Sequence, residues 1–194
     1  MTRSGRWSIS GPKAGGDLRY PVEVSIDPTS LQIVVYPDPI LTTPAHAVDV
    51  IDPTVEAVAE RMLQLMHKKD GAGLAAPQVG LPWRMFVTHD PDIDGGGFVW
   101  INPSVTAVDP RETTEEEGCL SLPGIHIQVR RPQHARLEAT TLTGQSVTTE
   151  SQEWIARVWQ HEFDHINGRL IIDRMSTMDR LANRKAIKSL QASS

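Results

Sequence analysis

The five residues 161–165 read His-Glu-Phe-Asp-His, and this pentad constrains the fold of the chain more than any other stretch. In an α-helix, residues four positions apart lie on the same face, so both imidazoles can point toward one place. Two imidazoles at this spacing can hold one metal ion, with Glu162 beside them to move protons. The pentad predicts a helix that carries a hydrolytic metal site. The alternative is a core helix whose histidines bond only to the backbone.

The residues around the pentad favour a helix. Apolar residues recur at helical spacing before and within it, among them Trp154, Ile155, Val158 and Ile166. Thr149 and Gln152 have the spacing of a capping box, which would start the helix directly after the threonine. Gly168 follows the last turn and suits a left-handed position that ends a helix.

Two histidines do not complete a catalytic zinc site, which usually keeps three protein ligands and one open position. The third-histidine position of the metzincin pattern is occupied by Ile171, which cannot bind a metal. The thermolysin pattern needs a downstream glutamate, and none follows Glu162. The third ligand must therefore come from another part of the chain, or be an aspartate such as Asp173.

Cys119 is the obvious candidate for that ligand. It is the only cysteine of the chain and follows an acidic run that ends at Glu117. A thiolate binds zinc and divalent iron strongly. A lone cysteine can also be a small buried apolar residue, so this assignment depends on the pentad.

A glycine-rich segment, Gly71–Gly80, offers a further set of functional groups. Its glycines permit a backbone to approach a ligand closely, and the Gln78 amide could donate to an oxyanion. The alternative is a helix stop followed by a tight loop. A dinucleotide-binding loop is excluded, because the third spaced glycine and a following helix are missing.

Together these segments resemble the peptide deformylase family, in the family's order. The family motifs G-x-G-L-A-A-x-Q, E-G-C-L-S and Q-H-E-x-D-H match residues 71–78, 117–121 and 160–165. The resemblance covers about residues 31–180. It implies an α+β fold: a single domain with antiparallel and mixed β-sheets around a central helix that carries the H-E-x-x-H motif.

The resemblance also implies a metal centre. Cys119, His161 and His165 would ligate one divalent ion, natively Fe(II), with Zn(II), Ni(II) or Co(II) able to replace it. Glu162 would be the general acid/base. The implied reaction removes the N-formyl group from the formylmethionine of nascent polypeptides and releases formate, by attack of a metal-bound water.

Further roles follow from the same resemblance. Gln78 and the Leu120 backbone N–H would bind the oxyanion. Glu117, at the motif position, is expected to accept a hydrogen bond from a metal-bound imidazole. Many family members place an arginine that touches the peptide where this chain has His126.

The substrate pocket can be proposed from helical spacing. Trp154 and Val158 precede the first histidine by seven and three residues, so they share roughly its helix face. They could line a methionine-sized pocket. The alternative is that both side chains face the core. The Ala72, Gly73 and Gly118 backbones are candidates for pairing with an extended substrate.

Two other classes of protein compete with this interpretation. A metallopeptidase of another class would cleave internal peptide bonds without needing Cys119. A structural zinc domain would close the site with a fourth protein ligand, for which no motif provides a candidate.

Composition bounds the remaining choices. With 194 residues, 39% of them hydrophobic, and a net charge of −5, the chain suits one domain and has no overall basic field for a nucleic-acid partner. One cysteine argues against a disulfide-stapled fold, and no stretch is long enough for a membrane span. We expect a cytoplasmic protein.

The domain organisation is expected in three parts. Residues 1–30 form an N-terminal extension, residues 31–180 form the catalytic domain, and residues 181–194 form a short tail. The basic residues of the extension make import into an organelle an alternative to the cytoplasm. Ribosome docking through a C-terminal helix occurs in some family members, so the exit region is a candidate partner. The alternative, favoured by the shortness of this segment, is a solvated basic face.

The secondary structure pattern is α+β. A helix should begin at Asp52-Pro53 and end before Gly71. A final short helix is expected within residues 175–190. Strands are expected near Arg84–His89, Phe98–Ile101, His126–Arg130 and Arg136–Leu142, and Thr143-Gly144 should turn the last into Gln145–Thr149.

Overall fold

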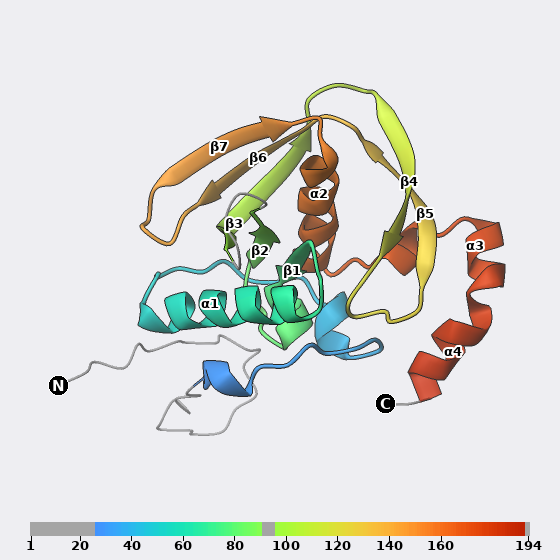
Figure 1. Ribbon diagram of the computed structural model, residues 1–194, viewed down its shortest axis with the longest axis horizontal. Coiled ribbons are helices and arrows are strands. Elements are labelled where there is room, and N and C mark those ends of the chain that lie inside the picture. Colours follow the sequence, from blue (N-terminus) through green and yellow to red (C-terminus); the bar gives the residue numbers. More distant parts are fainter. Residues whose placement is uncertain (1–25, 91–95, 193–194) are drawn as a thin grey trace, which may run out of the picture.

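The structure is a computed structural model that describes residues 26–90 and 96–192. Most of the N-terminal extension expected over residues 1–30 therefore lies outside the described residues. Within them, the chain forms an α+β domain of two antiparallel sheets and four α-helices (Figure 1).

The larger sheet has five antiparallel strands in the order β1-β2-β3-β6-β7. Their bounds are Gly73–Ala75, Met85–His89, Gly97–Ala107, Ala135–Thr140 and Ser146–Ser151. The last two strands form the hairpin expected around the Thr143-Gly144 turn, and Gly144 has the positive φ of 78° that such a turn requires. Each of the five strands expected between residues 84 and 149 is present.

The sheet separates two helices. Along β2, Met85 and Val87 belong to the apolar cluster that contains the face of α1, whereas Phe86 belongs to the cluster that contains α2. Because neighbouring residues of a strand point to opposite faces, α1 and α2 cover opposite sides of this sheet. The sheet thus gives α2 a fixed support.

Helix α1 spans Pro53–Lys68 and begins as the sequence predicts. The Asp52 carboxylate accepts hydrogen bonds from the backbone N–H groups of Thr54 and Val55, at 2.9 and 3.0 Å. Its buried face packs against β1, β2 and β3.

Helix α2 spans Trp154–Ile166 and carries the pentad. The prediction of a capping box at Thr149 and Gln152 is wrong. Thr149 lies in β7, where it pairs with Leu137 of β6, and the helix begins only after Glu153. Gly168 has a φ of 69°, as predicted for the residue that follows the helix.

The second sheet is a hairpin of β4 (Glu112–Gly118) and β5 (His126–Pro132). In Figure 1 it stands on the side of α2 that faces away from β6 and β7. Strand β4 was not expected from the sequence. Its only buried residue is Glu117, so it lacks the apolar alternation that marks a strand.

The C-terminal residues form two helices rather than the single one expected within 175–190. They are α3 (Thr177–Ala182) and α4 (Arg184–Ala192), separated at Asn183. Ile187 and Leu190 of α4 pack against the apolar cluster of the hairpin. None of the helices among the described residues is long and apolar enough to cross a membrane.

Candidate active site and metal centre

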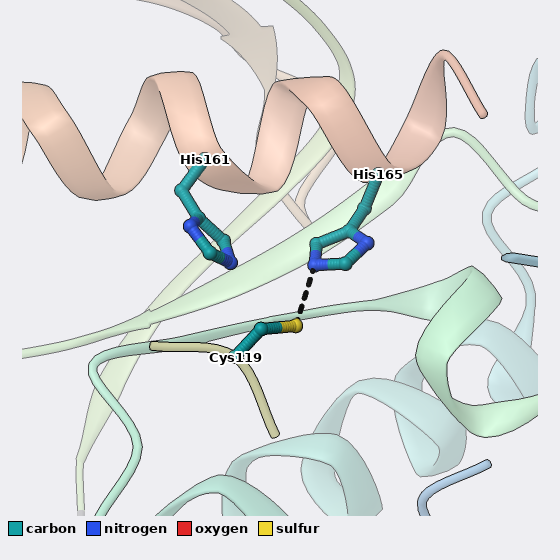
Figure 2. A group of neighbouring side chains, drawn as sticks. All are labelled: Cys119, His161 and His165. Carbon is teal, nitrogen blue, oxygen red and sulfur yellow. Dashed lines mark hydrogen bonds between the residues drawn. The ribbon is translucent and has the colours of Figure 1, made fainter. Parts of the chain in front are cut away.

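The three expected metal ligands come together where the β4–β5 hairpin meets α2. Cys119 directly follows β4, and its Sγ lies 3.3 Å from Nε2 of His165. The donor atoms of Cys119, His161 and His165 all lie within 4.8 Å of one another. Figure 2 shows both imidazoles extending from one face of the helix toward the sulfur.

This donor set fits a divalent transition metal. One thiolate and two imidazoles are ligands that zinc and divalent iron both accept. Among the described residues the group has three members, which is the number expected for a catalytic site with an open position rather than for a closed structural one. Asp173, the alternative third ligand, is exposed and accepts a hydrogen bond from the Leu170 N–H instead.

The first histidine is oriented by a buried carboxylate. Nδ1 of His161 lies 3.0 Å from Oε2 of Glu117, as expected for that motif position. Arg131 holds the same carboxylate with two hydrogen bonds, of 2.6 and 2.9 Å. Burial alone would raise the pKa of Glu117, but the hydrogen bonds from Arg131 and His161 hold it well below its usual range. Glu117 is therefore ionised at neutral pH, and its carboxylate fixes the orientation of the His161 ring.

Arg131 also forms an ion pair with Asp164, which lies on α2. Nη1 of Arg131 donates to Asp164 at 2.8 Å, and Arg174 donates to both oxygens of Asp164 at 2.7 and 2.6 Å. The sequence motifs assign no role to Arg131. Its position in a buried network depends on tertiary structure.

The two imidazoles have different electrostatic environments. Burial lowers the pKa of His161, but interactions with Cys119 and Glu117 outweigh it and raise the value to about 10. The pKa of His165 is lowered well below its ordinary value by burial and by the charges of His161 and Arg131. The anionic groups that attract a proton to His161 would attract a divalent cation equally, so proton and metal compete for this place.

Glu162 is a buried carboxylate suited to proton transfer. It is 3% exposed, and its Oε2 has no hydrogen-bond partner among the described residues. Burial raises its pKa to about 7, close to the value that favours a general base at neutral pH. Gly73 lies so near that a Cβ there would stand 2.6 Å from Oε1.

The Gln78 amide is held in one orientation. Its Oε1 accepts a hydrogen bond of 2.8 Å from the Ala75 N–H. Its Nε2 is therefore directed toward Ser121 Oγ, at 3.3 Å, and Cys119 Sγ, at 3.6 Å. A donor is thus presented beside the candidate metal ligands.

A cleft of about 420 Å³ opens onto these groups. Gln78, Cys119, Leu120, His161 and Glu162 line it. The five expected substrate-binding residues also border it: Ala72, Gly73, Gly118, Trp154 and Val158.

Two of these cleft residues differ in depth. Trp154 is 55% exposed at the first turn of α2, whereas Val158 is buried. Arg157 borders the same cleft and contacts Glu117, although sequence analysis did not single it out. Its position one helical turn before His161 was the available signal.

Comparisons with known proteins agree with this geometry. The family model described as polypeptide deformylase matches residues 30–181. The peptide deformylase of Thermotoga maritima is 41% identical over 159 residues, which cover 82% of this chain and 95% of that protein. Peptide deformylase 1B, chloroplastic, of Oryza sativa is 36% identical over 182 residues, covering 93% of this chain and 67% of the relative.

Solved structures give the same result. A plant peptide deformylase PDF1B superimposes with a TM-score of 0.82 at 35% identity, covering 88% of this chain and 93% of the other. The Thermotoga maritima enzyme gives 0.71 at 41% identity, covering 75% and 97%. Motifs, fold and relatives agree that the chain belongs to the polypeptide deformylase family, whose members remove the N-formyl group from nascent polypeptides.

Proposed function

We propose that the chain deformylates the N-terminal formylmethionine of nascent polypeptides with one divalent metal ion, natively Fe(II), held by Cys119, His161 and His165. Zn(II), Ni(II) or Co(II) would be able to replace iron. The observation that carries the proposal is the convergence of a thiol and two imidazoles beside a buried carboxylate, at the end of a cleft.

The bound ion would supply Lewis acidity, lowering the pKa of a water toward about 7 and polarising the formyl oxygen. Glu162 accepts the proton of the attacking water and later donates it to the leaving nitrogen. A pKa of about 7 lets one carboxyl group serve in both directions at neutral pH.

Two donors stabilise the charge that develops on the formyl oxygen. The Gln78 Nε2 group is pre-oriented by the Ala75 N–H, so little reorganisation accompanies the reaction. The backbone N–H of Leu120 is the second proposed donor. In other enzymes, removal of one such donor costs about 2.7–4 kcal/mol.

The cleft would hold the substrate around the reacting group. Trp154 and Val158 would contact the methionine side chain, and the backbones of Ala72, Gly73 and Gly118 would pair with the extended peptide. Their shared position on one cleft supports this assignment.

We place this activity in the cytoplasm near the ribosome exit, where formylated chains emerge. The basic side chains of the C-terminal helices offer a surface for such docking: Arg180, Arg184, Lys185 and Lys188. The chloroplastic names of plant relatives make organellar import the alternative location.

The test is formate release from formyl-Met-Ala-Ser by wild type and Glu162→Gln, with the bound metal quantified in both. We expect the variant to keep its metal and lose activity by about 10²–10⁴-fold, the usual contribution of a general base. Glu116→Gln, which alters an exposed carboxylate on the cleft, should retain wild-type activity. Undiminished turnover by a metal-loaded Glu162→Gln variant would exclude the assigned role.

A further inference from the structure

Arg157 joins α2 to both strands of the β4–β5 hairpin. Its Nη1 donates to Glu117 Oε1 at 2.7 Å and to the Val129 carbonyl at 3.0 Å. Its Nη2 donates to the Thr113 carbonyl and hydroxyl, at 3.0 and 2.9 Å. Its Nε lies 3.3 Å from Glu115 Oε2. The two terminal nitrogens of the guanidinium thus make four hydrogen bonds to the hairpin, and Nε forms an ion pair with Glu115.

These acceptors follow the register of the hairpin. Thr113, Glu115 and Glu117 alternate along β4 and therefore share one face of the strand, while Val129 is the β5 partner of Glu115. The Arg157 side chain is only 10% exposed. One planar group thus fixes the helix against a defined stretch of both strands.

The candidate metal ligands need a link between the hairpin and α2, because they come from both of these elements, and each element packs in a different sheet or cluster. His161 and His165 belong to α2, which packs through apolar side chains on the five-stranded sheet. Cys119 follows β4, which belongs to the separate two-stranded sheet. The distance from sulfur to imidazole therefore depends on how the hairpin is held against the helix.

Arg157 acts at the point where this distance is set. It lies one helical turn before His161, and both side chains contact the Glu117 carboxylate. Moving Glu117 would rotate the His161 ring, and moving β4 would displace the cysteine that follows it.

We infer that Arg157 is a positioning residue for the metal centre: its guanidinium holds the cysteine-bearing hairpin and Glu117 against α2, so that the thiolate and two imidazoles are pre-arranged for one ion. The inference rests on the metal site of the proposed function. It assigns no contact with the reacting atoms to Arg157.

Lysine should not replace this arginine. An ammonium group keeps the positive charge but has three donors on one nitrogen, so it cannot span Thr113, Glu117 and Val129 together. Arg157→Lys thus separates the geometric link from the charge.

The test measures zinc release to a chelator from Zn(II)-loaded wild type and Arg157→Lys, in the absence of substrate. Loss of a residue that orients metal ligands typically costs about 10–100-fold in metal affinity, and we expect zinc release to accelerate by about that factor. The visible spectrum of the Co(II)-loaded protein should also change, because it reports ligand geometry.

Arg130→Lys is the matched control. Arg130 lies on β5 of the same hairpin, pairs with Glu112 of β4 and is 74% exposed, so its ion pair does not reach α2. This variant should release zinc at the wild-type rate. Thermal unfolding of all variants separates a loosened site from general destabilisation.

Wild-type zinc release and an unchanged Co(II) spectrum in folded Arg157→Lys would overturn the inference. If that variant does not fold, Thr113→Val removes a single acceptor; a few-fold faster release would then support the inference and an unchanged rate would refute it. Failure of the wild type to bind one zinc would instead refute the metal site of the proposed function itself.

Discussion

Glu162 and Gly73 show how closely the site is packed at the scale of single residues. The Glu162 carboxylate is buried, and Gly73, which has no side chain, packs against it. A Cβ at residue 73 would lie 2.6–2.9 Å from three atoms of Glu162. The glycine is therefore required by close approach, and its substitution is a direct way to displace the proposed base.

Gly73→Ala should lose most of its deformylase activity while retaining metal. The added methyl group must move the Glu162 carboxylate, whereas Cys119 and the two histidines keep their positions. Formate release and metal content measured on the same sample will check this. Gly144→Ala is a suitable control. Gly144 lies in a hairpin turn with a φ of 78°, which strains an alanine, but no atom crowds the new Cβ. It should lose some stability and no activity; wild-type kcat in Gly73→Ala would contradict the proposed arrangement.

Helices and the hairpin contribute to the site at the scale of elements. Helix α1 supports the sheet from the face opposite α2 and begins at a locally encoded cap. The junction of hairpin and α2 is different, because it depends on buried charges centred on Glu117. The two cases predict different responses to substitution.

Asp52→Ala should lower the free energy of unfolding by about 1 kcal/mol, the usual value of an N-cap side chain. Two backbone N–H groups lose their acceptor, and the site on the far side of the sheet is unaffected. Urea unfolding and formate release measure the two effects. Asp49→Ala, at an exposed position before the helix, should change stability by less than about 0.5 kcal/mol. Equal stability of Asp52→Ala and wild type would show that the cap contributes nothing.

Glu117→Gln should be less stable than wild type at pH 7, by about 3 kcal/mol, because it leaves buried arginines without their counter-charge. The folded-state pKa of Glu117 is depressed, so its contribution is complete above its unfolded pKa of about 4.3 and is lost as pH falls toward the lower folded value. The stability difference between wild type and variant should therefore shrink below about pH 4.

Urea unfolding midpoints between pH 3 and pH 7 provide this comparison. Glu138→Gln, an exposed substitution on β6, serves as the reference for ordinary carboxylates. A difference between wild type and Glu117→Gln that stays constant across this range would argue against a depressed pKa.

At the scale of the whole molecule, sequence predicts what is encoded locally or in motifs. The start of α1 follows from Asp52-Pro53, and the three candidate metal ligands follow from motifs far apart in the chain. Strand β4 escapes prediction because its acidic residues acquire strand structure only by pairing with β5. The Arg157 contacts escape it too, since they require the hairpin and α2 to be placed together.

We propose that the β4–β5 hairpin and α2 bring one thiolate and two imidazoles onto one ion. X-ray absorption of the Zn(II)-loaded protein tests it most directly, compared with Cys119→Ser as the control. We predict one sulfur neighbour at about 2.3 Å together with nitrogen or oxygen neighbours near 2.0–2.1 Å, and loss of the sulfur in the variant. A zinc environment without sulfur in the wild type would exclude Cys119 as a metal ligand.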